Sequence, residues 1–457
     1  MPASALPPGP RNRFPGDLVL RFAFDRIGFV QDLARRYGDI AFFRLWGMPA
    51  ALVNHPDLVR DVLVTQQRLF VKGIGLERAK VLLGEGLLTS EGAHHLRQRR
   101  LIQPAFHREV VAGHAATMVD HAERWAARWQ AGQRLDVAQE MAALTLSIAG
   151  RTLFGADVEE DAREIGDALG DAIQTFDLAL LPFGDRLVRL PIPPAIRFRR
   201  AKARLDAIVY RLIAERRAAP RADGHDVLSM LLAARDTEGD GRGMSDAQVR
   251  DEALTLLLAG HETTANALTW CWYLLSQHPD VEARLHAEVD AVAPGRPLTA
   301  DDVPHLAYTR AVVSEGMRLF PPAYIVGRRA IAPWPVPGTD WVLPTGTLVL
   351  ASQYLLHRDP RYWSEPERFR PERWLPSQAA DRDGAAREPR ERFAWFPFGA
   401  GTRICIGEGF AWMEATLVLA TLARRWAFRL VPGHRVEGQP IITLRAKHGM
   451  AMSTISR

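Results

Sequence analysis

Helical periodicity runs through most of the stretch from Val111 to Val292, and this stretch constrains the fold more than any other feature of the chain. Clusters of Gly, Pro and Asp interrupt it at a few places, which predicts several helices joined by short loops. Beyond Pro321 the pattern changes to short β-like pieces, such as Trp341–Pro344 and Thr347–Ser352. The expected fold class is therefore mainly α with a smaller β region.

The first part of the chain is expected to start with extended backbone. Residues 1–16 form a Pro-rich lead-in, and Pro7–Pro10 cannot be helical because proline lacks a donor and restricts the preceding residue. A short helix is predicted over Phe29–Tyr37. Ile40–Leu45 and Ala50–Asn54 predict a small hairpin.

The chain shows no internal repeat and no low-complexity linker between autonomous units. A single large domain is therefore predicted over residues 17–457, with β-rich parts near 40–54 and 321–352. A strong final helix is predicted over Gly409–Trp426.

Composition narrows the functional classes. Of 457 residues, 47% are hydrophobic, and the formal net charge is only +5, which does not favour a nucleic-acid binder. Cys271 and Cys405 are the only cysteines, too few for a disulfide framework or a Cys-based zinc site. No apolar run reaches the roughly 18 residues of a membrane span, and the start does not read as a signal peptide. We therefore expect a cytoplasmic protein without a membrane anchor.

One loop concentrates glycine, arginine and cysteine directly ahead of the final helix. Phe398–Gly407 reads Phe-Gly-Ala-Gly-Thr-Arg-Ile-Cys-Ile-Gly, and its three glycines permit backbone turns that a side chain would block. A helix N-terminus favours a thiolate over a thiol at Cys405. A lone cysteine is more often a small buried hydrophobe than a ligand, so the surrounding pattern carries the interpretation.

The loop resembles the haem-binding loop of the cytochrome P450 family, at positions spaced as in that family: Phe398, Gly399, Gly401, Arg403, Cys405 and Gly407. The resemblance implies haem b as cofactor, with Cys405 as the axial ligand of the iron. It also implies that Arg403 binds a haem propionate, a role that suits a guanidinium.

Further propionate contacts are implied by other segments. Gly92–Arg100 begins a basic helix that by itself fits a solvated surface equally well. Aligned with the family through Pro104-Ala105-Phe106, it places His95 and Arg99 at propionate positions, with His95 where many members have Trp. Arg328 matches a third contact. Arg97 and Arg100 would then face outward, on a basic surface suited to an acidic electron-transfer partner.

A long helix is predicted after Ser245, which forms a capping box with Gln248, up to His278-Pro279. Its middle, Ala259–Thr264, is polar although a helix of this length should be buried there. An ordinary alternative is a Thr bonding back to the preceding turn and Glu262 pairing with an Arg. The segment resembles the family's oxygen-binding groove, which implies that Glu262 and Thr263 relay protons during oxygen activation.

Glu315 and Arg318 share one helix face, and most such pairs are solvated. Here they match the family's Glu-x-x-Arg, and Phe369–Trp374 matches its Pro-Glu-Arg segment. Together they imply a buried structural triad of Glu315, Arg318 and Arg373. Trp374 stands where the family usually has Phe, a change expected to affect packing more than chemistry.

The resemblance covers nearly the whole chain and implies a mono-oxygenase that hydroxylates or epoxidises an apolar small molecule, such as a fatty acid, terpenoid or steroid, with O2. Because no reductase domain follows the loop Phe398–Gly407, a ferredoxin or flavodoxin with its NAD(P)H reductase is expected to supply electrons. Two alternatives remain: a peroxygenase or isomerase, which the acid-alcohol pair disfavours, and a non-catalytic haem sensor.

The substrate pocket is expected to be mostly apolar, with mobile loops at Phe183-Gly184 that open its entrance. Its lining is expected from four places in the chain: the segment after Val71, Thr175–Pro191, the long helix near Ala259, and Ala323–Val326.

Overall fold

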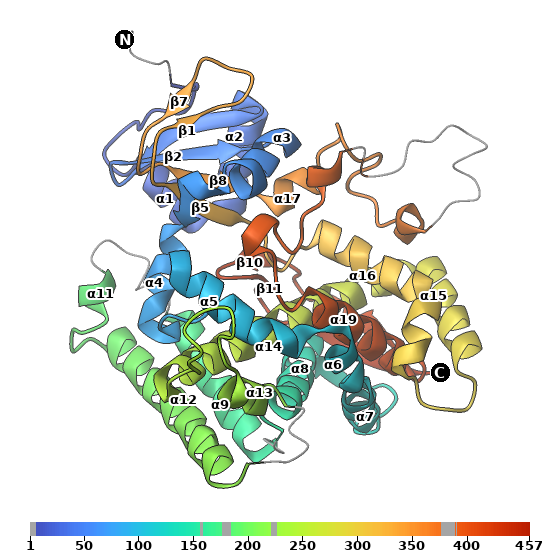
Figure 1. Ribbon diagram of the computed structural model, residues 1–457. Coiled ribbons are helices and arrows are strands. Elements are labelled where there is room, and N and C mark those ends of the chain that lie inside the picture. The colour runs from blue at the N-terminus through green and yellow to red at the C-terminus, as the bar shows by residue number, and fades with distance from the viewer. Residues whose placement is uncertain (1–5, 156–158, 176–183, 221–225, 376–388, 390) are drawn as a thin grey trace. The chain divides into compact units, whose positions relative to one another are not determined.

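The structure is a computed structural model that describes residues 6–155, 159–175, 184–220, 226–375, 389 and 391–457 (Figure 1). The chain divides into two compact units, each built from segments far apart in the sequence. Unit 1 comprises residues 1–77, 314–405 and 442–444. Unit 2 comprises residues 78–313, 406–441 and 445–457.

Unit 1 is organised around a five-stranded sheet with strand order β1-β2-β8-β5-β3. Its strands are β1 (Ile40–Leu45), β2 (Met48–Val53), β3 (Phe70–Lys72), β5 (Val326–Ala330) and β8 (Leu348–Ala351). β2 and β8 are parallel and the other neighbours antiparallel. β6 (Trp334–Pro335) and β7 (Val342–Leu343) form a separate pair.

The helices of unit 1 pack apolar side chains against this sheet. Residues such as Phe29, Leu33 and Phe43 are almost fully buried in one shared cluster. The helices are α1 (Asp17–Phe24), α2 (Arg26–Tyr37), α3 (Pro56–Arg60) and α17 (Gln353–Leu356); α4 (Ile74–Leu83) and α16 (Ala307–Leu319) each have their two ends in different units.

Unit 2 is mainly helical. Its helices are α5 (Gly92–Ile102), α6 (Arg108–Gly113), α7 (Ala115–Ala126), α8 (Val137–Phe154), α9 (Glu159–Gln174), α11 (Gly184–Leu187), α12 (Pro193–Ala218), α13 (Val227–Ala233), α14 (Asp246–Gln277), α15 (Pro279–Val292) and α19 (Glu408–Ala423). α14 packs against α8, α12 and α19, and its Trp270 and Trp272 are fully buried. This helix forms the centre of the unit's core.

A small antiparallel sheet, in the order β4-β12-β9, accompanies these helices. Its strands are β4 (Arg134–Asp136), β9 (Trp426–Leu430) and β12 (Ala451–Ser456), and β10 (Gly438–Pro440) pairs with β11 (Leu444–Ala446). The expected fold class, mainly α with a smaller β region, is therefore confirmed.

Most predicted elements are present with small shifts. The first hairpin strand has the predicted bounds, and the second begins two residues early, at Met48. The helix after Ser245 begins as predicted, because Ser245 and Gln248 form the reciprocal capping box. The predicted end of the last helix is wrong: α19 stops at Ala423, and Trp426 opens β9, where it pairs with Ser456 and donates its indole N–H to the Ala126 carbonyl.

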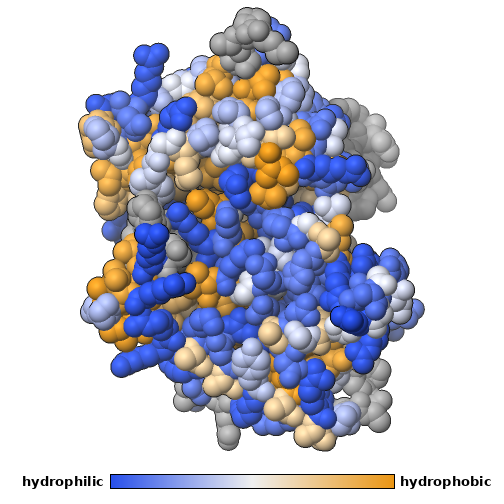
Figure 2. Space-filling model, turned by 60° about the vertical axis from the view of Figure 1, so that its left-hand side comes forward, coloured by the Kyte–Doolittle hydropathy of each residue, from blue (hydrophilic) through white to orange (hydrophobic). Residues whose placement is uncertain are grey.

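The exposed surface is mainly hydrophilic on the face that Figure 2 draws, and the helices are not of the membrane-spanning kind in the described residues. Figure 2 shows one face of the protein, on which hydrophilic residues predominate and hydrophobic residues gather in separate groups. Within the described part of the chain, no helix combines the length and the apolar character that crossing a membrane requires.

Candidate functional site

The glycine-rich loop of unit 1 has a fixed backbone. Gly399 and Gly401 adopt φ of +73° and +70°, in the left-handed region where a Cβ is disfavoured. A Cβ on Gly401 would also lie 2.0 Å from the Leu63 carbonyl oxygen. The Thr402 backbone N–H and hydroxyl both donate to Gln67 Oε1, at 3.0 and 2.7 Å. The loop is therefore anchored on residues 61–69, and glycine is required at position 401.

Cys405 is exposed at the end of this loop, and its backbone N–H donates to the Phe398 carbonyl at 3.0 Å. Arg403 is half-buried in the same loop. The other cysteine, Cys271, is buried in α14, where burial raises the pKa of its thiol to about 12. Of the two thiols, Cys405 is thus the accessible one.

Gly407 differs from the other two glycines. Its φ is −87°, which any residue can adopt, and a Cβ there would make only an ordinary contact, 3.6 Å from Phe106. The expectation that a side chain at 407 would block the backbone is therefore wrong. Gly407 is the N-cap of α19, which begins three residues after Cys405.

Glu315, Arg318 and Arg373 lie together inside unit 1. The Glu315 carboxylate accepts from Arg318 Nε and Nη2, both at 2.8 Å, and from Arg373 Nε at 3.0 Å. All three side chains are at most 1% exposed. Arg318 donates further to the carbonyls of His357 and Pro366, at 2.8 and 2.6 Å. These bonds join α16 to two later segments of the chain.

Trp374 belongs to the same cluster. Its indole N–H donates to Glu315 Oε2 at 2.9 Å, a bond that Phe cannot make. The expectation that Trp in place of Phe changes packing more than chemistry is therefore wrong. The ring also packs against Trp363 and Trp395, with centroids 5.6 and 4.6 Å away.

The polar middle of α14 has two different faces. Seven consecutive residues before Ala259 are buried, but Ala259 is exposed and Gly260 and Thr263 are half-buried. A Cβ on Gly260 would have no neighbour within 4 Å. Residues 259, 260 and 263 share one helix face, so this face borders open space in an otherwise buried helix.

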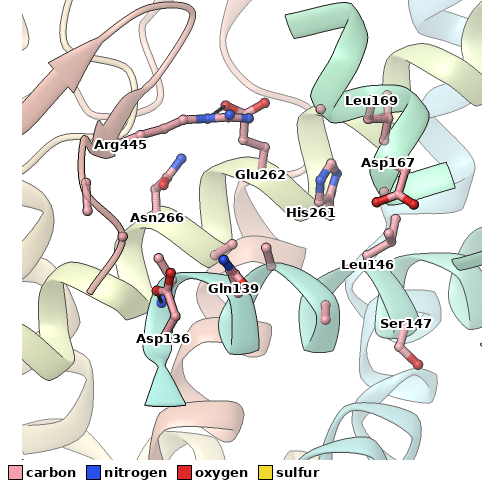
Figure 3. Close-up of a pocket in the computed structure, with 18 of the residues that line it drawn as sticks. Asp136, Gln139, Leu146, Ser147, Asp167, Leu169, His261, Glu262, Asn266 and Arg445 are labelled. Atoms are coloured by element: carbon pink, nitrogen blue, oxygen red, sulfur yellow. Dashed lines mark hydrogen bonds and ion pairs between the residues drawn. The ribbon is translucent and has the colours of Figure 1, made fainter. Parts of the chain in front are cut away.

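Glu262 points the other way, into a cavity of about 990 Å³ within unit 2 (Figure 3). Arg445 of β11 donates to its carboxylate through Nε at 2.7 Å. The cavity is lined mainly from α8, α9, α14 and β11, and Figure 3 shows Asn266 near this ion pair and Gln139 farther from it, on α8. The carboxylate is 5% exposed, so Arg445 compensates a nearly buried charge.

Both parts of the ordinary alternative for this segment are present. The Thr263 hydroxyl donates to the Ala259 carbonyl at 2.7 Å, and Glu262 is paired with an arginine. α14 is helical throughout. Because adjacent residues of an α-helix point about 100° apart, the two side chains face different surroundings, Glu262 toward the cavity.

Two more titratable groups belong to this segment or lie next to it, His261 and Glu414. Burial lowers the pKa of His261, whose Nδ1 contacts the Leu257 carbonyl at 2.9 Å. In α19, burial raises the pKa of Glu414 to about 8, an effect that nearby Thr264 partly opposes. At neutral pH, Glu414 is therefore mostly a neutral acid and His261 a neutral imidazole.

The predicted propionate contacts fall in both units. His95 and Arg99 lie four residues apart on one face of α5, His95 buried and Arg99 half-buried. Arg328 is 8% exposed in β5 and donates to the Gly327 carbonyl at 3.0 Å.

Of the two arginines expected to face outward, Arg100 does so, with a side chain that is 40% exposed, but both arginines are paired. Arg100 makes a bidentate pair with Asp236 at 3.0 Å, and Arg97 donates to the carbonyls of Arg242 and Gly243. The Arg97 side chain is only 18% exposed. The loop before α14 thus compensates much of the charge that was expected to attract an acidic partner.

The expected pocket segments are only partly described. Residues 176–183 of the stretch Thr175–Pro191, and Phe183 with them, lie outside the described residues. Ala259 belongs to unit 2, and Ala323–Val326 to unit 1, where Ala323 is exposed.

Two residues of the site, Arg445 and Glu414, and one hydrogen bond, from Trp374 to Glu315, were not predicted from the sequence. Arg445 and Glu414 reach α14 from elements far along the chain, and no local spacing links them to it. The hydrogen bond from Trp374 to Glu315 could have been suspected from the sequence, because the indole N–H of a buried Trp usually has an acceptor.

Comparison with known proteins agrees with this arrangement. The family model described as Cytochrome P450 matches residues 7–449. Cyclooctatin synthase of Streptomyces melanosporofaciens is 43% identical over 90% of this chain and 87% of its own. Cyclooctat-9-en-7-ol 5-monooxygenase of the same organism is 41% identical, over 87% and 84%. Pentalenene oxygenase of Streptomyces avermitilis is 37% identical, over 89% and 88%.

A solved structure of retinoic acid bound cyanobacterial CYP120A1 has the same fold, with a TM-score of 0.87, 27% identity and full coverage of both chains. Sequence and fold thus agree over nearly the whole length. The chain belongs to the cytochrome P450 family and is a mono-oxygenase of that family.

Proposed function

We propose that this protein uses O2 and two externally supplied electrons to hydroxylate or epoxidise a cyclic terpenoid. The observation that carries the proposal is the identity of 37–43%, over most of the chain, with relatives named for cyclooctat-9-en-7-ol and pentalenene. Both are largely apolar molecules, as expected from the sequence. The proposal includes residues 17–457 acting as one catalytic domain, in the cytoplasm, with a separate ferredoxin or flavodoxin and its NAD(P)H reductase as electron source.

The family implies a haem cofactor, and we propose haem b held by Cys405. One observation fits a flat ligand: the exposed Cys405 thiol follows a loop in which a Cβ on Gly399 would meet nothing within 4 Å. Haem bound through a thiolate supplies oxygen activation, because the sulfur donates electron density that favours O–O cleavage.

The other residues of the glycine-rich loop are proposed to form part of the cofactor-binding site. Phe398 and Gly399 precede Cys405 and hold its backbone through the bond to the Phe398 carbonyl, and Gly407 opens the following helix. His95, Arg99, Arg328 and Arg403 are proposed to bind the propionates, since arginine forms charge-assisted bonds with carboxylates.

Glu262 and Thr263 are proposed to move protons to the reacting oxygen. Glu262 faces the cavity, through whose water a proton from solvent can reach it, and Thr263 presents a hydroxyl on the half-buried side of α14. For transfer, Glu262 has to loosen its bond to Arg445, and Thr263 has to turn its hydroxyl away from the Ala259 carbonyl. Arg445 then acts as a positioning residue for Glu262.

The reaction itself provides the first test. With NADPH, a surrogate ferredoxin and its reductase, the protein should add one oxygen atom to members of a panel of cyclic terpenes and terpene alcohols. Mass spectrometry should find one atom of ¹⁸O from ¹⁸O2 in the product. Product formed only with added peroxide would instead identify a peroxygenase, an isomeric product without added oxygen an isomerase, and binding without product from either system a sensor.

The proton relay predicts separate effects for its two members. Glu262→Gln keeps the size of the side chain but removes the acid, so the rate of product formation should fall by about 100-fold, with a larger solvent isotope effect. Thr263→Ala should keep NADPH consumption while more of the electrons end in hydrogen peroxide. Stopped-flow kinetics and peroxide assays measure both.

Gln139→Ala is the matched control for the relay, because Gln139 is an exposed residue that lines the same cavity. It should leave the rate and the isotope effect unchanged. If Glu262→Gln behaved like Gln139→Ala, Glu262 would have no part in proton transfer.

The cluster around Glu315 is proposed to stabilise the part of unit 1 that carries the glycine-rich loop. Glu315→Gln leaves two buried guanidiniums without their carboxylate, so the free energy of unfolding should fall by about 3–5 kcal/mol in urea denaturation. Trp374→Phe removes one hydrogen bond to a charged group and should cost about 1.5–3 kcal/mol.

Glu215→Gln is the control for this cluster. Glu215 pairs with Arg211 at 3.2 Å, and the two side chains are 57% and 46% exposed, so its loss should cost at most about 1 kcal/mol. Equal effects of Glu315→Gln and Glu215→Gln would contradict a structural role for the cluster.

A further inference from the structure

An apolar ridge is exposed on the first helix of unit 1. On α1, Leu18 and Val19 are buried, whereas Leu20 and Phe24 are 47% and 87% exposed. Residues four apart share one face of a helix, so Leu20 and Phe24 form a ridge that points away from the core. Phe14, 53% exposed, lies just before the helix. We refer to these three residues as the α1 ridge.

Exposed apolar residues are concentrated in this part of the chain. Single exposed hydrophobic residues are ordinary, but a group of them marks an interaction surface. Of the 11 large hydrophobic residues that are exposed in the described chain, five lie between residues 6 and 46: Leu6, Phe14, Leu20, Phe24 and Trp46.

The α1 ridge is carried by a firmly packed element. α1 packs on α2 and β1. Phe22 of α1 meets Phe29 edge to face with centroids 5.7 Å apart, and Phe29 meets Phe43 of β1 in the same way at 5.4 Å. The ridge is therefore presented at a fixed position on the sheet of unit 1.

Positive charge prevails in the sequence on both sides of the α1 ridge. Residues 11–36 contain six arginines and three aspartates, a net charge of +3. Two of the aspartates, Asp17 and Asp32, are largely buried, and Asp32 is already paired with arginines. The arginine side chains are more accessible: Arg11 and Arg13 are exposed, and those of Arg35 and Arg36 are 76% and 54% exposed.

We propose that the α1 ridge and its arginines bind the surface of an anionic phospholipid bilayer. Phe and Leu side chains enter the boundary between headgroups and acyl chains, and nearby arginines are attracted to anionic headgroups. A second copy of the chain fits the surface less well, since it would bring two positive patches together. This peripheral contact needs no membrane-spanning helix, and it is independent of the proposed reaction.

Vesicle co-sedimentation of the holoenzyme tests this proposal. The protein should sediment with phosphatidylcholine vesicles that contain phosphatidylglycerol, and much less with phosphatidylcholine alone or at high salt. The double variant Leu20→Ser/Phe24→Ser should weaken partitioning by about tenfold or more, since two apolar side chains no longer enter the bilayer. Arg11→Gln/Arg13→Gln should weaken it only for the anionic vesicles.

Leu96→Ser is the matched control, because Leu96 is 49% exposed on α5, in the other unit. It should partition like the wild type. Failure of the wild type to sediment with anionic vesicles, or equal partitioning of the double variant and wild type, would overturn the proposal. A dimer in light scattering that the double variant abolishes, without vesicle binding, would show that a second copy covers the ridge.

Discussion

The burial of α14 sets the conditions for the rest of unit 2. A helix of 32 residues at the centre of a core should be mainly apolar at its buried positions, as α14 is in the runs Leu256–Leu258 and Trp270–Trp272. Its middle instead holds Glu262, whose charge is compensated by Arg445, and Thr263, whose hydroxyl bonds to Ala259. These two contacts reduce the free-energy cost of burying the polar groups. The helix face of Ala259, Gly260 and Thr263 is less buried than its neighbours.

In unit 1, the irregular loop before Cys405 is held in place by contacts with other segments. The loop before Cys405 cannot stabilise itself through regular hydrogen bonds, so it is tied to Gln67 and pressed against Leu63. The Glu315 cluster joins α16 to the segment around residues 357–374, just before this loop in the sequence. The buried Glu315 carboxylate accepts four hydrogen bonds from the side chains of Arg318, Arg373 and Trp374 and a fifth from the Arg370 backbone N–H, which permits few other arrangements of these segments.

Local signals were sufficient for much of the fold. The capping box at Ser245 and the apolar stretch Ile40–Leu45 depend on neighbouring residues, and both elements begin where predicted. β9 was missed because its pairing with β12 joins segments whose partnership no local pattern reveals. The residues of the Glu315 cluster were predicted through the family resemblance, but the part of Trp374 depends on a tertiary hydrogen bond. Arg445 is a similar case, since it meets α14 from 183 residues away in the chain.

The most direct test of the account is the absorbance spectrum of the dithionite-reduced protein with carbon monoxide, for the wild type and Cys405→Ser. Thiolate ligation by Cys405 predicts a strongly red-shifted Soret band in the wild type that the variant loses. Absence of this band in well-folded, haem-loaded wild-type protein, or its persistence in Cys405→Ser, would contradict the central claim.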